Sequence, residues 1–285
     1  MDSKTEPLVS VGLPCYNRPE MLKRAIDCML NQTYKNIELL ISNDCSPNPE
    51  VYRLLDEYAA KDSRIRLWHQ PVDLEVYGNY YFVQSHATGT YFMYLQDDDW
   101  WEPDSIELMV KDLEAHPDNA LSIGRCCYDD VTGKKWWEFD FEPQNIIRFI
   151  YGEKIAFLWM GLWRLDIMRQ FDNAPEYIYG KDILICAETV LSYPFSYVDK
   201  LLYHKTIYHD KETKNMLADP FCYFKMYGRL LKNIAFSKCV KRKWLLVFLV
   251  PAAVAGLVRV YSAKLLFALP LNHPIRRGVR QLLRG

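Results

Sequence analysis

The sequence predicts an α/β fold in which helices cover both faces of a mainly parallel sheet. One observation is the alternation, over residues 1–105, of short apolar runs of strand length with segments whose apolar residues recur at helical spacing. A second is that polar or acidic residues directly follow three of the apolar runs. In parallel sheets ligands bind beyond the carboxyl ends of the strands, so we expect these residues at one edge.

The predicted elements follow one another closely. A strand at 8–14 turns into a helix with Pro19 near its first position, and a strand at 37–42 precedes a second helix. A third strand at 65–69, a helix at 77–87 and a fourth strand at 90–95 complete the series. The first two helices have an apolar face each, formed by Met21, Leu22, Ala25, Ile26, Met29 and Leu30, and by Val51, Leu54, Leu55 and Tyr58. Asn17, Asp44 and the acids after residue 96 should therefore converge.

Three consecutive acids, Asp97, Asp98 and Asp99, follow the fourth strand. Because like charges repel strongly at a half-buried site, this run indicates a bound cation. Mg²⁺ and Mn²⁺ take oxygen ligands, and Mg²⁺ is usually held by one or two carboxylates and substrate phosphates. An alternative is an N-terminal cap for the helix that starts near Pro103, but Asp99 or Glu102 alone would suffice for that.

Four segments form a longer pattern within the first 105 residues. Residues 9–18 read VSVGLPCYNR, 31–34 read NQTY, 41–46 read ISNDCS and 89–99 read GTYFMYLQDDD. They resemble, in the same order, the VSVIIPTYNR, SQTY, VVDDGS and GEYIAFLDSDD motifs of family 2 glycosyltransferases. The resemblance implies the Rossmann-like GT-A fold and an inverting transferase that uses a nucleotide sugar.

Position by position, the resemblance implies a nucleotide site. The turn from Pro14 through Tyr16 to Asn17 would line the nucleotide pocket. Asp44 would accept a hydrogen bond from the base, and Asp97 would face the ribose.

The resemblance also implies a metal and phosphate site. Asp98 would coordinate the Mn²⁺ or Mg²⁺ ion that bridges the two phosphates, and Asp99 is a further candidate ligand. Residues 203–209, YHKTIYH, resemble the family's YYRIHGDS stretch, which makes His209 a metal ligand and Lys205 a cation for the phosphates. Gln96 differs from the family's aspartate and is not assigned as a ligand.

The reaction needs a base that removes a proton from the acceptor hydroxyl. Residues 180–184, GKDIL, resemble the family's EDYDL motif, with Lys181 in place of its glutamate. Asp182 is therefore the predicted catalytic base. Glu188, six residues further along, is the alternative, and either acid could instead be a solvated charge near a helix start.

Four tryptophans lie between the aspartate run and the predicted base: Trp136, Trp137, Trp159 and Trp163. Indoles stack on sugar rings, but most large aromatic side chains belong to the core. We expect one or two of the four to contact a ligand. Residues 160–164, MGLWR, resemble a loop of small residues near the donor sugar in the family.

The charge distribution predicts two parts. Residues 221–285 contain thirteen Lys or Arg and no acid, whereas residues 1–220 contain 22 bases and 36 acids. We expect a catalytic domain at 1–219, with a nucleotide-binding half at 1–105 and an acceptor half at 106–219, and a helical tail at 220–285. The apolar run 244–258 is shorter than the ~20 residues needed to span a bilayer. It therefore indicates a tail lying in an anionic membrane surface, or one packed on the domain.

These observations predict a metal-dependent inverting glycosyltransferase, peripheral at the cytoplasmic face of a membrane. Its acceptor would be a membrane-linked glycan, a glycolipid or a polysaccharide. The eight cysteines show no CxxC pair, and residues 1–7 are polar, so a reducing compartment and no secretory signal are expected. No nucleic acid partner is expected, since the tail has no recognised binding motif.

Two other functions remain open. One is a catalytically silent glycan-binding or scaffold subunit of the same fold, against which the intact acidic run argues. The other is a sugar nucleotidyltransferase, which would be expected to have a Gly-rich basic phosphate loop around residues 14–18.

Overall fold

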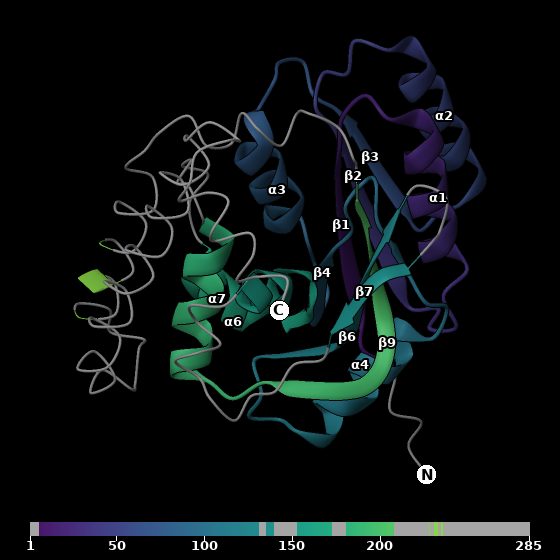
Figure 1. Ribbon diagram of the computed structural model, residues 1–285. Coiled ribbons are helices and arrows are strands. Elements are labelled where there is room, and N and C mark those ends of the chain that lie inside the picture. The colour runs from purple at the N-terminus through teal and green to yellow at the C-terminus, as the bar shows by residue number, and fades with distance from the viewer. Residues whose placement is uncertain are drawn as a thin grey trace, which may run out of the picture.

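A computed structural model describes residues 6–130, 135–139, 153–172 and 181–207, and the single positions 228, 231, 232 and 235. In this part of the chain the strands form one sheet of nine, in the order β3-β2-β1-β4-β8-β6-β9-β5, with β7 paired to β6. Helices α1 and α2 lie on one side of the sheet, and α3, α6 and α7 lie on the other (Figure 1). The predicted α/β fold with helices on both faces is thus confirmed.

The amino-terminal half matches the predicted order of elements. They are β1 (Val9–Cys15), α1 (Pro19–Leu30), β2 (Ile37–Asn43), α2 (Pro49–Lys61), β3 (Ile65–His69), α3 (Glu75–Ser85) and β4 (Tyr91–Tyr94). β1 pairs in parallel with β2 and β4, and β2 pairs in parallel with β3. Every residue of β1, β2 and β4 is buried, as expected for parallel strands covered on both faces.

The second half makes the sheet mixed. Its elements are β5 (Trp100–Trp101), α4 (Ser105–Ala115), β6 (Leu121–Asp130), β7 (Lys135–Phe139), the 3₁₀ helix η1 (Glu153–Met160), β8 (Leu162–Arg164), α6 (Leu165–Phe171), α7 (Lys181–Ser192) and β9 (Ser196–Ile207). β6 and β9 are parallel to each other. β8 lies antiparallel between β4 and β6. β5 pairs antiparallel with β9, and β7 pairs antiparallel with β6.

The strand order reverses at β1, and we call the region beyond Cys15 of β1 and Tyr94 of β4 the crevice. The chain builds β1, β2 and β3 outward in one direction and then returns to place β4 on the other side of β1. Right-handed crossovers consequently put α3 on the opposite face from α1 and α2 (Figure 1). Such a reversal is where ligands bind in open α/β sheets.

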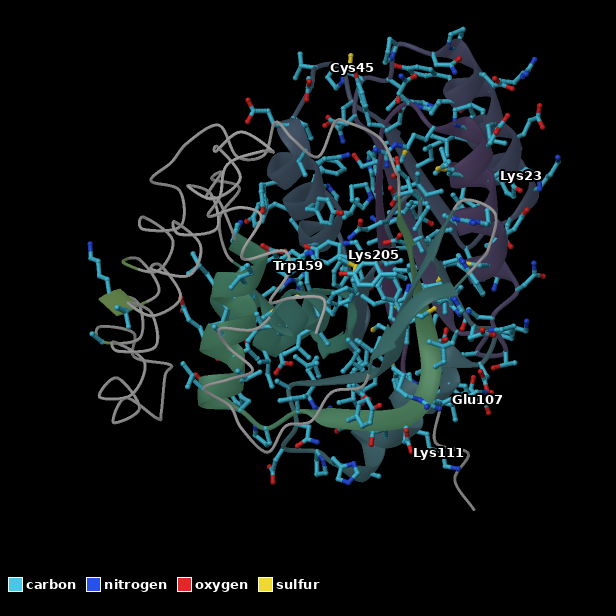
Figure 2. All side chains as sticks on the ribbon, viewed as in Figure 1. Lys23, Cys45, Glu107, Lys111, Trp159 and Lys205 are labelled. Carbon is cyan, nitrogen blue, oxygen red and sulfur yellow. The ribbon has the colours of Figure 1, made fainter. Side chains whose placement is uncertain are left out.

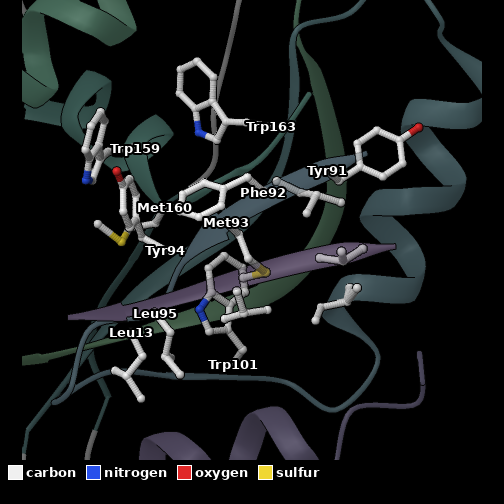
Figure 3. Packing of buried hydrophobic residues seen from close by; sticks show 14 of the residues in the cluster. Leu13, Tyr91, Phe92, Met93, Tyr94, Leu95, Trp101, Trp159, Met160 and Trp163 are labelled. Atoms are coloured by element: carbon white, nitrogen blue, oxygen red, sulfur yellow. The ribbon is translucent and has the colours of Figure 1, made fainter. Parts of the chain in front are cut away.

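The core is aromatic where the two halves meet. Trp101 and Trp163 are fully buried, and the indole N–H of Trp163 donates to the Leu158 carbonyl at 3.0 Å. The rings of Tyr94 and Trp159 stack with their centroids 4.8 Å apart. Figure 3 shows these residues around β4. Trp163 therefore belongs to the core.

Buried polar side chains connect the elements. The Gln32 amide donates to the Glu102 carbonyl at 2.8 Å, and its oxygen accepts from the Ile106 N–H at 3.2 Å. The Thr33 N–H donates to the Pro103 carbonyl at 2.8 Å. The NQTY segment thus joins the end of α1 to the start of α4.

The predicted division at residue 219 and the predicted tail lie outside the described ranges. Within those ranges, no helix combines the length and the apolar character needed to cross a bilayer.

Candidate active site

Backbone strain is concentrated around the crevice. Among the described residues other than glycine, Asn17, Cys45 and Glu75 have positive φ angles, of 56°, 55° and 59°. Asn17 follows β1, Cys45 follows β2, and Glu75 begins α3 after β3. Such conformations cost about 1–3 kcal/mol for a residue with a side chain, and they cluster at ligand sites. All three turns face the predicted edge of the sheet.

Asp97 lies against the turn after β1. One of its carboxylate oxygens accepts from the Tyr16 N–H at 3.0 Å, and the other lies 3.4 Å from Nη1 of Arg18. Burial, with the charge of Asp98 second, raises the pKa of Asp97 to about 6, although the Tyr16 N–H and Arg18 oppose the rise. The carboxylate is thus held at the carboxyl end of β1.

Asp98 presents its carboxylate to the same guanidinium. Its Oδ2 atom lies 2.5 Å from Nη1 of Arg18, and 13% of its side chain is exposed. The backbone carbonyl of Asp98 accepts from Nη2 of Arg24 at 2.7 Å and from the hydroxyl of Thr206. Nη2 of Arg24 also donates to that hydroxyl at 2.8 Å. α1 and β9 therefore hold the backbone of Asp98 while its carboxylate remains accessible.

The carboxylate of Asp99 is directed toward β9. One of its oxygens accepts from the Tyr203 hydroxyl, and the other accepts from the Thr206 N–H at 2.8 Å. Its side chain is buried, and burial, with the charge of Asp98 second, raises its pKa above the ordinary value. Both oxygens thus have partners in β9, so we leave Asp99 out of the metal site proposed below.

The predicted nucleotide-binding residues surround one end of the crevice. Pro14 lies in β1 opposite Ser42 of β2, and the Asn17 N–H donates to the Ser46 hydroxyl at 3.0 Å. Half of Tyr16 is exposed, unusual for a large ring. The large apolar residues exposed in the described part of the chain are Tyr16, Val72 and Val76. Tyr16 directly follows β1, Val72 lies between β3 and α3, and Val76 lies in the first turn of α3.

Asp44 lies at the end of β2. Its Oδ1 atom accepts from the Leu74 N–H at 2.8 Å, and its own N–H donates to the Cys15 carbonyl at 3.0 Å. Burial raises the pKa of Asp44, and the neighbouring Asp73 raises it further, although the Leu74 N–H opposes the change. Its position beside the strained Cys45 turn is compatible with the base contact expected from the sequence.

A pocket of about 140 Å³ adjoins the acidic run. Its residues come from α3, η1, α7 and β9 and from the segment after β4: Val76, Tyr77, Tyr80, Gln96, Phe157, Trp159, Met160, Asp182 and Lys205. Burial and the charges of the three aspartates raise the pKa of Tyr80, which shows how near they are. Figure 2 shows Trp159 and Lys205 in the middle of the molecule. Four of the nine lining residues are aromatic, and two are charged.

The two charged groups of the pocket are the predicted base and the predicted phosphate cation. Asp182 lies in the first turn of α7, where burial raises its pKa above the ordinary value. Hydrogen bonds from its own N–H and that of Ile183, and the charge of Lys205, oppose the rise. Glu188 lies further along α7, and it is not among the residues that line the pocket.

Gln96, left unassigned from the sequence, also lines the pocket. Its amide lies 3.5 Å from the Met160 sulfur, at the C-terminal end of η1. Of the four tryptophans, Trp159 lines the pocket. The side chains of Trp136 and Trp137 lie outside the described part of the structure, as does His209.

Sequence reasoning missed the residues that hold the acidic run. Arg18, Arg24, Tyr203 and Thr206 all contact Asp97, Asp98 or Asp99, yet none was predicted to do so. One signal was present for Arg18, because a cation at the start of a helix is unfavourable unless acids lie nearby. Within the described ranges, no three His, Cys, Asp or Glu side chains could hold a metal ion by themselves.

Two solved structures with a similar fold contain a bound nucleotide sugar. S. aureus TarS in complex with UDP-GlcNAc matches with a TM-score of 0.68 and 15% identity, over 87% of this chain and 72% of that one. The mannosyltransferase PcManGT from Pyrobaculum calidifontis, in complex with GDP-Man and Mn²⁺, matches with a TM-score of 0.62 and 14% identity, over 98% of this chain and 81% of that one. The chain thus has the GT-A fold of nucleotide-sugar transferases.

The profile of the family described as Glycosyl transferase family 2 matches residues 10–172. The chain therefore belongs to glycosyl transferase family 2, and its described part is a glycosyltransferase domain. Chondroitin synthase from Pasteurella multocida is 25% identical over 227 residues, which cover 74% of this chain and 22% of that protein. The chain spans about a fifth of the length of three curated relatives that it matches, chondroitin synthase among them.

Proposed function

We propose that this chain transfers a sugar, with inversion, from a nucleoside-diphosphate donor to a glycan acceptor, with a divalent ion at Asp98. The observation that carries the proposal is the pocket beside the acidic run, which Gln96, Asp182 and Lys205 line. A metal-binding carboxylate and a base are the two groups such a displacement needs. Here Asp98 comes from the segment after β4, and Asp182 comes from the first turn of α7.

The nucleotide would lie over the carboxyl ends of β1 and β2. Its base would stack on the exposed ring of Tyr16 and donate a hydrogen bond to the Asp44 carboxylate, with Asp97 near the ribose. Pro14 and Asn17 would shape the turn beneath it. The two similar structures support a nucleotide-sugar donor, since they contain UDP-GlcNAc and GDP-Man.

The residues present fit a divalent metal ion. Two carboxylates, those of Asp97 and Asp98, already converge on a cation, the Arg18 guanidinium. Carboxylate oxygens suit Mg²⁺ and Mn²⁺, and substrate phosphates usually complete the ligand set. Asp98 would hold the ion, with His209 as a second ligand. When bound, the ion would stabilise the negative charge that grows on the leaving diphosphate.

Asp182 would act as the base. The acceptor oxygen bonds to the anomeric carbon as its proton passes to the Asp182 carboxylate, and the bond to the diphosphate oxygen breaks with its electrons on the phosphate. The pKa of Asp182, raised by burial, brings it closer to the range of an effective base at neutral pH. Lys205, on the same pocket wall, would offset phosphate charge.

The acceptor would be a growing polysaccharide, a glycolipid or another membrane-linked glycan. The similarity to chondroitin synthase supports a polysaccharide. The acid-free, cationic segment at 221–285 supports action at an anionic, cytoplasmic membrane surface.

A donor screen tests the proposal. The full chain is incubated with UDP-, GDP- and dTDP-sugars and Mn²⁺ or Mg²⁺, and release of the nucleoside diphosphate is measured. Metal-dependent release from one class of donor is expected. If every donor stays intact but glycans bind, the chain is a glycan-binding subunit. If it instead joins a sugar phosphate to a nucleoside triphosphate, it is a nucleotidyltransferase.

A further inference from the structure

Arg18 occupies an unusual place. It caps the N-terminus of α1, a position usually held by Ser, Thr, Asp or Asn, and its side chain makes no capping hydrogen bond. A positive charge there is opposed by the helix dipole, at a cost of about 0.3–1 kcal/mol. The left-handed turn at Asn17 directly precedes it. Something other than the stability of α1 must therefore account for an arginine here.

The partners of Arg18 supply the reason. Its Nη1 atom lies 2.5 Å from Asp98 and 3.4 Å from Asp97, so one guanidinium nitrogen bridges both carboxylates. The two acids are 13% exposed, whereas the Arg18 side chain is 47% exposed. The Arg18 side chain is therefore partly in solvent while it pairs with the two acids. Arg24 differs, because its two hydrogen bonds to Asp98 and Thr206 fix it to backbone and hydroxyl oxygens.

We propose that Arg18 is an internal counter-ion that the divalent metal displaces. It holds Asp97 and Asp98 together before the metal binds, and it competes with the metal for the Asp98 carboxylate. The inference rests on the proposed metal site. Its consequence is that the protein alone binds metal weakly, and that the metal enters together with the diphosphate, whose negative charge favours both the ion and the released guanidinium.

Direct titration of Mn²⁺ tests this, with the free ion measured by electron paramagnetic resonance. The full chain is compared with the Arg18→Met variant, without nucleotide and with UDP or GDP. Arg18→Met keeps the length of the stem and removes the charge, so we expect Mn²⁺ to bind the protein alone about two- to fivefold more tightly. The metal-free variant should also melt at a lower temperature, since Asp97 and Asp98 then repel each other.

Two variants control the comparison. Lys23→Met removes the same charge from the outer face of α1 (Figure 2), where Lys23 pairs with Asp27, and it should leave Mn²⁺ binding unchanged. Asp98→Asn should abolish the binding. Arg18→Gln replaces Arg18→Met in all titrations if the latter fails to fold.

The outcomes separate the inference from the proposed function. If Asp98→Asn loses Mn²⁺ binding but Arg18→Met binds no more tightly than the wild type, Arg18 is not a competitor, while the metal site stands. If neither the wild type nor Arg18→Met binds Mn²⁺ without nucleotide, although both bind it with UDP or GDP, Arg18 does not compete with the metal. If no protein binds Mn²⁺ under any condition, both the inference and the metal site are wrong.

Discussion

Three adjacent aspartates have three different environments because each contacts a different element. Asp97 accepts from the turn after β1, Asp98 faces the crevice, and Asp99 is buried against β9. Because all three residues are aspartates, their different roles follow from their contacts alone. The sequence could therefore predict an acidic site here, but the inward orientation of Asp99 depends on Tyr203 and Thr206, which are about a hundred residues away.

We expect Asp182 to affect turnover strongly without contributing to donor binding. Asp182→Asn should lower kcat by a factor on the order of 10²–10⁴, the usual contribution of a general base. The donor dissociation constant should barely change, because the group acts on the acceptor. Turnover and donor binding are measured separately. Loss of donor binding with normal turnover at saturation would remove Asp182 from the catalytic role and favour Glu188.

The pH profile gives an independent readout of the same residue. Only the ionised carboxylate accepts a proton, and burial raises the pKa of Asp182. In the wild type, kcat should therefore rise with pH through a value above the ordinary range of aspartate. Lys205→Met removes a positive charge that lowers this pKa, so the rise should move to higher pH. A profile that does not move in the variant would separate Lys205 from the base.

At the scale of elements, the sequence predicted the amino-terminal half well and the remainder poorly. β1 to β4 and the helices α1 and α2 show local apolar patterns, and each of these strands is joined to the next by one helix. β8 has three residues, too few for any periodic pattern, and it lies antiparallel between β4 and β6. Such pairing is decided by tertiary packing, which a local pattern does not contain. The mixed half of the sheet was therefore not predictable, although the motif containing Asp182 was.

One buried carboxylate joins four of the segments at the amino end of the sheet. Glu38 of β2 accepts from the hydroxyl of Ser10 at 2.6 Å, from the N–H of Thr88 at 2.7 Å and from Arg66 at 3.0 Å. Burial alone would raise its pKa, but these hydrogen bonds outweigh burial and lower the pKa below the ordinary 4.5. Folding stability from Glu38 is therefore fully present above about pH 4.5 and is lost as pH falls through the lower, folded-state pKa.

Replacement of the Glu38 carboxylate should lower the free energy of unfolding but leave the catalytic residues in place. Glu38→Gln loses the charge opposite Arg66, so we expect the free energy of unfolding at pH 7 to fall by about 1–3 kcal/mol. Because the wild type loses the same contribution in acid, the difference should shrink below pH 4.5. Urea unfolding at pH 7 and pH 4 measures both. An unchanged difference between the two pH values would contradict the assigned ionisation.

At the scale of the whole molecule, charge divides the chain. Residues 221–285 carry thirteen bases and no acid, around the apolar run at 244–258. We expect the full chain to sediment with vesicles that contain anionic lipid and to be partly released at high salt, since salt screens the charges but not the apolar insertion. Truncation after Asp219 should abolish sedimentation and spare donor hydrolysis. Sedimentation of the truncated chain would move the membrane contact elsewhere, and unfolding would indicate a tail packed on the domain.

The most direct test of the proposed function is donor cleavage by the wild type and by Asp98→Asn, each with Mn²⁺ and with excess chelator. We predict that the wild type cleaves one class of nucleotide sugar only with metal, and that Asp98→Asn is inactive under both conditions. The variant should keep nearly the wild-type melting temperature, because loss of the partly exposed Arg18 pair and relief of repulsion from Asp97 oppose each other. Full activity of Asp98→Asn, or of the wild type in chelator, would contradict the metal-dependent mechanism.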